Sequence, residues 1–187
     1  MLSFPVPGRI GRMTAMETPN NHFSASNRLC LTLVTGEVGA GKTTRLARYV
    51  SDCRGCGLRV GGVIARRTRD GYEFVDVNSG CARAYAARNP DQGPAACLRF
   101  LFDAEAFAWL NGVLRSAVED RCDVIVYDEY GPLERGGGGA FGALNEVVAR
   151  FPGRLAIAVR RSLAHHVPIA LGIPPAGVEI IDVGFLS

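Results

Sequence analysis

The sequence predicts an α/β fold built on a mostly parallel sheet, and three features of the chain support this. Residues 29–34 are a short apolar run, typical of a buried strand, and they lead directly into a glycine-rich loop. After the loop, residues 43–53 carry apolar side chains at helical spacing. Residues 123–127 form a second apolar run, which ends in two acidic residues. Strands that alternate with helices in this way favour a parallel sheet.

Length and composition are those of one globular domain with a substantial core. The chain has 187 residues, of which 48% are hydrophobic and 21% charged. Its net charge of +3 is too small to argue for nucleic acid or an anionic membrane, and we find no clear nucleic-acid patch. No apolar run approaches the length of about 18 residues that a membrane span needs. Because the first residues lack the apolar core of a secretory signal, we expect a cytoplasmic protein.

We expect two parts along the chain, an unstructured leader at 1–27 and one domain at 28–187. Prolines, glycines and polar residues interrupt any regular pattern in the leader. Within the domain, Cys53 and Cys56 form a C-x-x-C pair, which could be a redox pair or half of a metal site. No second such pair exists, so we favour the alternative that Cys53 packs in the core and Cys56 lies at a helix end.

The loop after the first strand carries a phosphate-binding motif. It fits the P-loop pattern Gly-x-x-x-x-Gly-Lys-[Ser/Thr], and we expect nucleotide contacts from Gly36, Glu37, Val38, Gly39, Ala40, Gly41, Lys42, Thr43 and Thr44. Its backbone N–H groups and the start of the helix would surround a phosphate. Lys42 would reach the β- and γ-phosphates, and Thr43 would offer its hydroxyl to Mg²⁺.

Lys42 is the one lysine of the chain, against 20 arginines. Arginine is therefore the default cation of this sequence. Lysine stands where a compact ammonium fits between phosphates and a planar guanidinium does not. A glycine turn with an incidental lysine, the alternative interpretation, does not account for this exception.

The two acids that end the second apolar run are Asp128 and Glu129. Together with a P-loop they form the Walker B pattern, in which Asp128 would hold Mg²⁺ with Thr43, directly or through water. Glu129 would lie beside the γ-phosphate and orient or deprotonate the attacking water. Glu129 and Lys42 are therefore our candidate catalytic residues. Acids also commonly begin turns, so this interpretation depends on the presence of the P-loop.

Between the two motifs the sequence predicts a β-meander attached to the sheet. Residues 58–66 and the strictly alternating residues 72–77 are predicted strands with an Asp-Gly turn between them, and a third strand is expected at 81–85. Arg66 and Arg67 end the first of these strands. They are either solvated or face a nucleotide or a second substrate, as tentative phosphate or acceptor contacts.

The rest of the chain alternates predicted loops, helices and strands. A loop is expected at 88–96 and a short strand at 98–102, followed by a helix that Asp103 caps. Further elements are expected as a helix at 140–150 and strands at 155–159 and 178–181.

Two features of this second half bear on function. Arg160 and Arg161 follow the strand at 155–159, so one of them could reach the γ-phosphate, the alternatives being plain surface charge or the start of a helix. The four glycines from Gly136 to Gly139 are expected to be mobile unless a ligand or protein partner orders them, the alternative being a flexible connector.

Residues 28–183 resemble the small P-loop nucleoside-triphosphatases first described from thermophiles, a family with a cancer-related animal relative. The likeness rests on residues 36–44, the arginine-bearing meander, the late Val159-Arg160 and, most specifically, residues 128–134. Tyr130, where an aliphatic residue is usual, and the glycine run depart from the family pattern. The resemblance implies a three-layer, RecA-like P-loop fold and slow Mg²⁺-dependent hydrolysis of ATP, GTP and other nucleoside triphosphates. It assigns Lys42 and Thr43 to phosphate and metal, Asp128 to Mg²⁺ and Glu129 to the water.

Three functions remain open from the residues alone. The first is a hydrolase. The second is a kinase that passes the γ-phosphate to a nucleotide or another small acceptor, against which stands the lack of a clear arginine-rich lid segment. The third is a nucleotide-dependent switch with slow hydrolysis, whose moving parts would be the loop at 88–96 and the glycine run. We favour the hydrolase, because Glu129 beside the γ-phosphate suits water activation.

Overall fold

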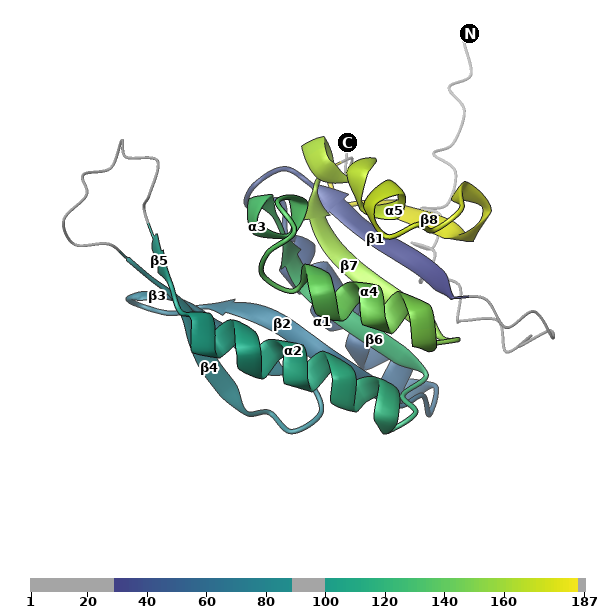
Figure 1. Ribbon diagram of the computed structural model, residues 1–187, viewed down its shortest axis with the longest axis horizontal. Coiled ribbons are helices and arrows are strands. Elements are labelled where there is room, and N and C mark those ends of the chain that lie inside the picture. Colours follow the sequence, from purple (N-terminus) through teal and green to yellow (C-terminus); the bar gives the residue numbers. More distant parts are fainter. Residues whose placement is uncertain (1–28, 89–99, 185–187) are drawn as a thin grey trace, which may run out of the picture.

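The computed structural model describes residues 29–88 and 100–184, and its eight strands form one sheet in the order β5-β4-β3-β2-β6-β7-β1-β8 (Figure 1). The strands are β1 (Cys30–Gly36), β2 (Val60–Arg67), β3 (Gly71–Asp76), β4 (Ala82–Arg88), β5 (Phe100–Phe102), β6 (Val124–Tyr130), β7 (Arg154–Arg160) and β8 (Val178–Asp182). The helices are α1 (Lys42–Gly55), α2 (Ala104–Glu119), α3 (Pro132–Arg135), α4 (Phe141–Arg150) and α5 (His166–Ala170), with 3₁₀ turns η1 (Arg161–Leu163) and η2 (Pro175–Gly177).

The sheet has a parallel half and an antiparallel half. β2, β6, β7, β1 and β8 pair in parallel, which confirms the mostly parallel sheet. The carboxyl ends of these strands therefore meet at one edge, where ligands of open α/β sheets bind. β3, β4 and β5 pair in antiparallel fashion beyond β2, which confirms the meander.

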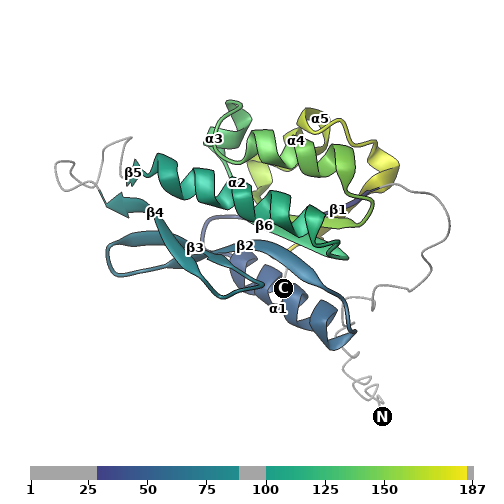
Figure 2. The same ribbon diagram turned by 60° about the horizontal axis from the view of Figure 1, so that its bottom comes forward.

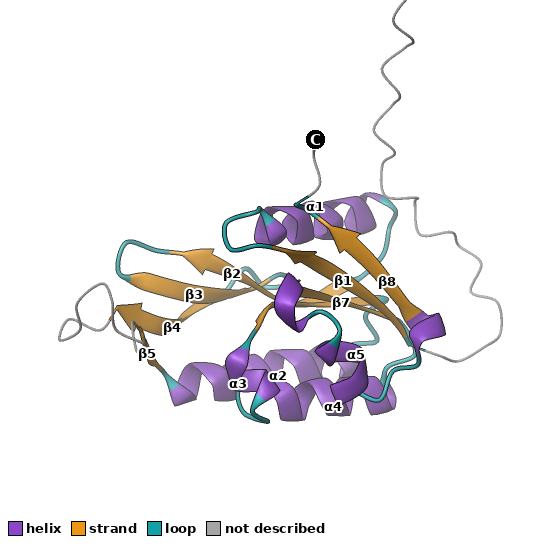
Figure 3. Ribbon diagram, turned by 90° about the horizontal axis from the view of Figure 1, so that it is seen from above, coloured by secondary structure: helices purple, strands orange, loops and turns teal. Residues whose placement is uncertain are grey.

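Helices cover both faces of the sheet, as the three-layer prediction requires. Figures 2 and 3 show α1 alone on one face and α2, α3, α4 and α5 on the other. α1 buries Leu46, Val50 and Cys53 against β1 and β6, and Tyr49 joins them. Cys53 thus belongs to the core, as expected, while Cys56 is exposed at the end of α1.

The predicted elements hold, with changes at their ends. Asp103 caps α2 as predicted, since its carboxylate accepts a hydrogen bond of 2.8 Å from the Glu105 N–H. β4 is longer than the predicted strand at 81–85, because its last residues keep pairing with β3 and then with β5. Arg88 consequently lies in a strand and not in the predicted loop. The rest of that loop and the leader at 1–27 lie outside the described residues. None of the described helices is long and apolar enough to cross a bilayer.

The first three glycines of the glycine run continue the turn that ends α3. Gly136 and Gly138 donate backbone hydrogen bonds of 3.1 and 2.9 Å to the carbonyls of Pro132 and Leu133. Gly137 donates one of 3.0 Å to the carbonyl of Glu134. The unpaired carbonyls at the end of α3 thus accept hydrogen bonds from the run, and its mobility stays a prediction.

Candidate nucleotide-binding site

The P-loop lies at the carboxyl end of β1 and leads into α1. Gly39 and Gly41 have φ angles of 80° and 93°, in the left-handed region that glycine adopts without strain. These angles turn the loop back toward the helix. Within the described chain no side chain caps α1, and its first turn carries no acidic residue. The N–H groups at the start of α1 therefore remain available to an anion.

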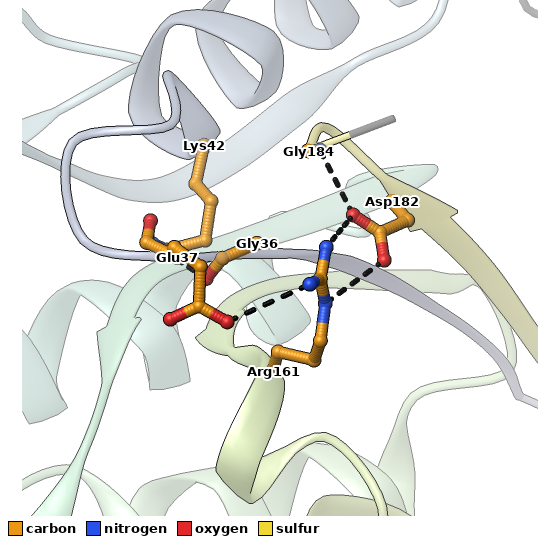
Figure 4. A network of polar contacts seen from close by, with 6 residues as sticks. All are labelled: Gly36, Glu37, Lys42, Arg161, Asp182 and Gly184. Atoms are coloured by element: carbon orange, nitrogen blue, oxygen red, sulfur yellow. Dashed lines mark hydrogen bonds and ion pairs between the residues drawn. The ribbon is translucent and has the colours of Figure 1, made fainter. Parts of the chain in front are cut away.

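The ammonium of Lys42 lies over the loop. Its Nζ donates hydrogen bonds to the carbonyl oxygens of Gly36, at 3.1 Å, and Glu37, at 2.8 Å (Figure 4). The one lysine of the chain therefore lies against the P-loop backbone, and its contact with phosphate stays a prediction.

Asp128 and Glu129 lie at the carboxyl end of β6. Asp128 is only 1% exposed, and the Thr43 side chain lies close enough to its carboxylate to act on its pKa. The carboxylate accepts backbone hydrogen bonds from Ala65, at 3.2 Å, and Glu129, at 3.0 Å. The Glu129 side chain is exposed at the same edge of the sheet. The fold thus brings together Thr43 and Asp128, the two residues that the sequence predicts as metal ligands.

The surroundings of Asp128 disfavour its negative charge. Burial, followed by the charge of Glu129, raises the pKa of Asp128 to about 7, although hydrogen bonds to the carboxylate oppose this. A nearby cation would offset both causes. Among the described residues there is no cluster of three or more His, Cys, Asp or Glu that could hold a metal. Because Mg²⁺ commonly takes one or two protein oxygens beside substrate phosphates, the Thr43–Asp128 pair fits that ion.

The raised pKa makes a prediction about stability. An unfolded aspartate has a pKa of about 3.9, so between about pH 4 and pH 7 the folded chain binds more protons than the unfolded chain. The contribution of Asp128 to the free energy of unfolding therefore falls as pH rises through this window. Without divalent cations, we expect the wild type to lose on the order of 3 kcal/mol relative to Asp128→Asn between these limits.

Urea unfolding of both proteins in a chelating buffer measures this difference. The other titrating groups are shared by the two proteins, so their contributions cancel. Parallel pH profiles for wild type and Asp128→Asn would show that Asp128 ionises in the folded chain as it does in the unfolded chain.

Of the two candidate arginines, Arg161 makes the contact with the P-loop. Arg160 is exposed and pairs in register with Gly36 at the end of β7. The Arg161 guanidinium donates hydrogen bonds of 3.1 and 2.8 Å to the Asp182 carboxylate, and it lies 3.6 Å from the Glu37 carboxylate (Figure 4). Arg161 thereby links the end of β8 to the P-loop.

The meander arginines are not brought to the P-loop. β6 and β7 lie between β2, which carries Arg66 and Arg67, and β1. Arg66 donates a hydrogen bond of 2.6 Å to Glu73 on β3, and Arg67 is exposed. Both residues end the strand whose Ala65 N–H holds Asp128, so they lie on the Asp128 side of the site.

Sequence reasoning missed two features that organise this edge of the sheet. One is the pairing of Arg161 with Asp182, which no local pattern predicts because Arg161 follows β7 and Asp182 ends β8. The other is Glu134, which is 2% exposed and accepts three hydrogen bonds. Gly131-Pro132-x-Glu134 has proline at the first helical position and an acid at the third, a helix-start signal that could have drawn attention to it.

Comparison with known proteins agrees with this geometry. A family model described as NTPase matches residues 31–172, which contain the P-loop, both acids and Arg161. The chain belongs to the NTPase family. The matched region of this NTPase-family chain runs from the start of β1 to the turn after α5, so it includes the P-loop and β6 but not β8.

Relatives of this NTPase-family chain carry the name nucleoside-triphosphatase THEP1. The protein of Methanothermobacter thermautotrophicus is 34% identical over 109 residues, 54% of this chain and 60% of the relative. That of Korarchaeum cryptofilum is 29% identical over 108 residues, 54% of each chain. The chain thus spans little more than half the length of these relatives.

Two solved structures share the fold. One is the crystal structure of THEP1 from Aquifex aeolicus, with a TM-score of 0.62, 20% identity and coverage of 83% of this chain and 90% of the other. The other is the solution structure of a human cancer-related nucleoside triphosphatase, with a TM-score of 0.62, 18% identity and coverage of 83% and 88%. At these identities the likeness supports the three-layer P-loop fold alone.

Proposed function

We propose that this chain hydrolyses nucleoside triphosphates to the diphosphate and phosphate, with Mg²⁺ and with ATP and GTP among its substrates. One observation carries the proposal. Thr43 of the P-loop meets the buried Asp128, and Glu129 is exposed beside them at the same edge of the sheet. The names of the THEP1 relatives support the same activity. A protein partner at residues 136–139 and a cytoplasmic location are further proposals.

Each residue has a separate role in this reaction. Lys42 and the N–H groups of the loop and of α1 bind the negative oxygens of the phosphates. The Glu129 carboxylate orients a water and accepts its proton as the water oxygen bonds to the γ-phosphorus and the bond to the bridging oxygen breaks. Bound Mg²⁺, held by Thr43 and Asp128, would neutralise charge on the β- and γ-phosphates.

Phosphate release from ATP, GTP, CTP and UTP, with Mg²⁺ or with a chelator, tests the proposal. We expect release that depends on Mg²⁺ with more than one base, because neither the P-loop nor the two acids contacts a base. Binding without release would make the chain a nucleotide binder. Formation of ADP without free phosphate, only when a small acceptor is added, would make it a kinase.

A further inference from the structure

We propose that Glu134 is a positioning residue that holds Glu129 in its active conformation through hydrogen bonds to the Tyr127 side chain before it and to the Gly131 backbone after it. The inference rests on the proposed function, since Glu129 is the group that would activate the water. The contacts on which it rests are three hydrogen bonds of the buried Glu134 carboxylate. Their effect on the backbone at Glu129 can be tested without measuring enzyme activity.

The backbone at Glu129 needs support. Its φ angle is 73°, in the left-handed region that residues with a side chain rarely adopt. The pairing of β6 with β7 is regular up to Tyr127, is interrupted, and resumes at Tyr130. Asp128 and Glu129 therefore occupy a bulge without the regular ladder that holds the rest of β6.

Glu134 binds this bulge from both ends. Its Oε1 accepts a hydrogen bond of 2.9 Å from the hydroxyl of Tyr127, just before the bulge. Its Oε2 accepts one of 2.9 Å from the N–H of Gly131, just after it. Burial, followed by the charge of Glu134, raises the pKa of Tyr127 well above its ordinary value, so the phenol stays protonated and remains a donor.

The same carboxylate also fixes the segment that follows α3. Its Oε1 accepts a hydrogen bond of 3.2 Å from the N–H of Ala140, at the start of α4. The backbone of Gly139 approaches it so closely that a Cβ there would lie 2.1 Å from Oε1. The last glycine of the run is therefore required by contact with Glu134, and the carboxylate is anchored to α4 as well as to β6.

A helix-capping role does not account for this arrangement. Capping explains the bond to Gly131, but an exposed acid would make that bond equally well. Burial of a carboxylate costs free energy unless hydrogen bonds compensate it, and here they come from three separate segments. The buried Glu134 carboxylate thus links β6, α3 and α4 close to Glu129, the residue that would activate the water.

The first test compares two tyrosines of the same strand. Tyr127→Phe removes the hydroxyl that binds Glu134, whereas Tyr130→Phe removes a buried hydroxyl that has no hydrogen-bond partner in the described structure. We expect Tyr127→Phe to lower kcat about 10-fold with KM unchanged, because a misplaced Glu129 affects the reaction and not nucleotide binding. Tyr130→Phe should leave both constants unchanged. Equal kcat values for the two variants would overturn the proposal.

The second test measures melting temperatures and needs no activity. Glu129→Gly should raise the melting temperature by about 2–4 °C, because glycine adopts the left-handed conformation without strain. If Glu134 imposes that conformation, the gain should vanish in a Glu134→Gln background, where the bulge can relax. The same gain in both backgrounds would show that the sheet imposes the conformation, and Glu134 would then be only structural.

The two tests separate this proposal from the proposed function. If the chain releases no phosphate but the rise in melting temperature vanishes in the Glu134→Gln background, the positioning role of Glu134 stands and the proposed hydrolysis is wrong. If the chain releases phosphate and the rise is the same in both backgrounds, hydrolysis stands and the positioning role is wrong. Should Glu134→Gln not fold, Tyr127→Phe takes its place in the second test, since it removes one of the three hydrogen bonds and keeps the carboxylate.

Discussion

Replacement of Lys42 by alanine is expected to abolish most of the thermal stabilisation that Mg²⁺ and ATP give the wild type. A charge-assisted hydrogen bond contributes about 1.5–3 kcal/mol, so its loss weakens binding by up to about 100-fold. At a nucleotide concentration of about 100 times the wild-type Kd, stabilisation would fall from about 2.7 to about 0.4 kcal/mol. Thermal unfolding with and without Mg²⁺ and ATP measures the change.

Two further variants sharpen this result. Lys42→Arg keeps the charge but replaces the compact ammonium by a planar guanidinium, and we expect it to bind nucleotide almost as poorly as the alanine variant. Arg48→Ala removes an exposed cation from the same helix and should behave as wild type. If Mg²⁺ and ATP raise the melting temperature of Lys42→Ala as much as that of the wild type, the P-loop does not bind the nucleotide.

Glu129→Gln is expected to keep nucleotide binding and to lower turnover by about 10²–10⁴-fold. Glutamine has the shape of glutamate but cannot take the proton from the attacking water. The charge of Glu129 is the second cause of the raised pKa of Asp128, so its removal should also make Asp128 easier to ionise. Nucleotide with Mg²⁺ should therefore bind at least as tightly as in the wild type. Phosphate release and a binding titration, measured side by side, separate the two effects.

Glu119→Gln, at the exposed end of α2, is the matched control and should release phosphate at the wild-type rate. If Glu129→Gln releases phosphate as fast as this control, another group activates the water. If it loses binding together with turnover, Glu129 contributes to the nucleotide pocket and not to the chemical step.

The local elements could be predicted because their causes are local. The apolar run before Gly36 and the stripe of Leu46, Val50 and Cys53 lie within single segments, and the structure places β1 and α1 there. Asp103 caps its helix through a contact two residues away. Errors concentrate at ends such as Arg88, where pairing with neighbouring strands decides how far an element continues.

By itself, the sequence determined the P-loop, the acid pair at the end of β6, the meander and the alternation of strands and helices that makes the sheet mostly parallel. Only the tertiary structure decided the contacts between these segments: Thr43 with Asp128, Arg161 with Asp182 and Glu37, and Glu134 with Tyr127, Gly131 and Ala140. The physical reason is that the periodicity of a segment specifies its conformation and its buried face. Which strand ends meet depends on the order of all eight strands, which no single segment encodes.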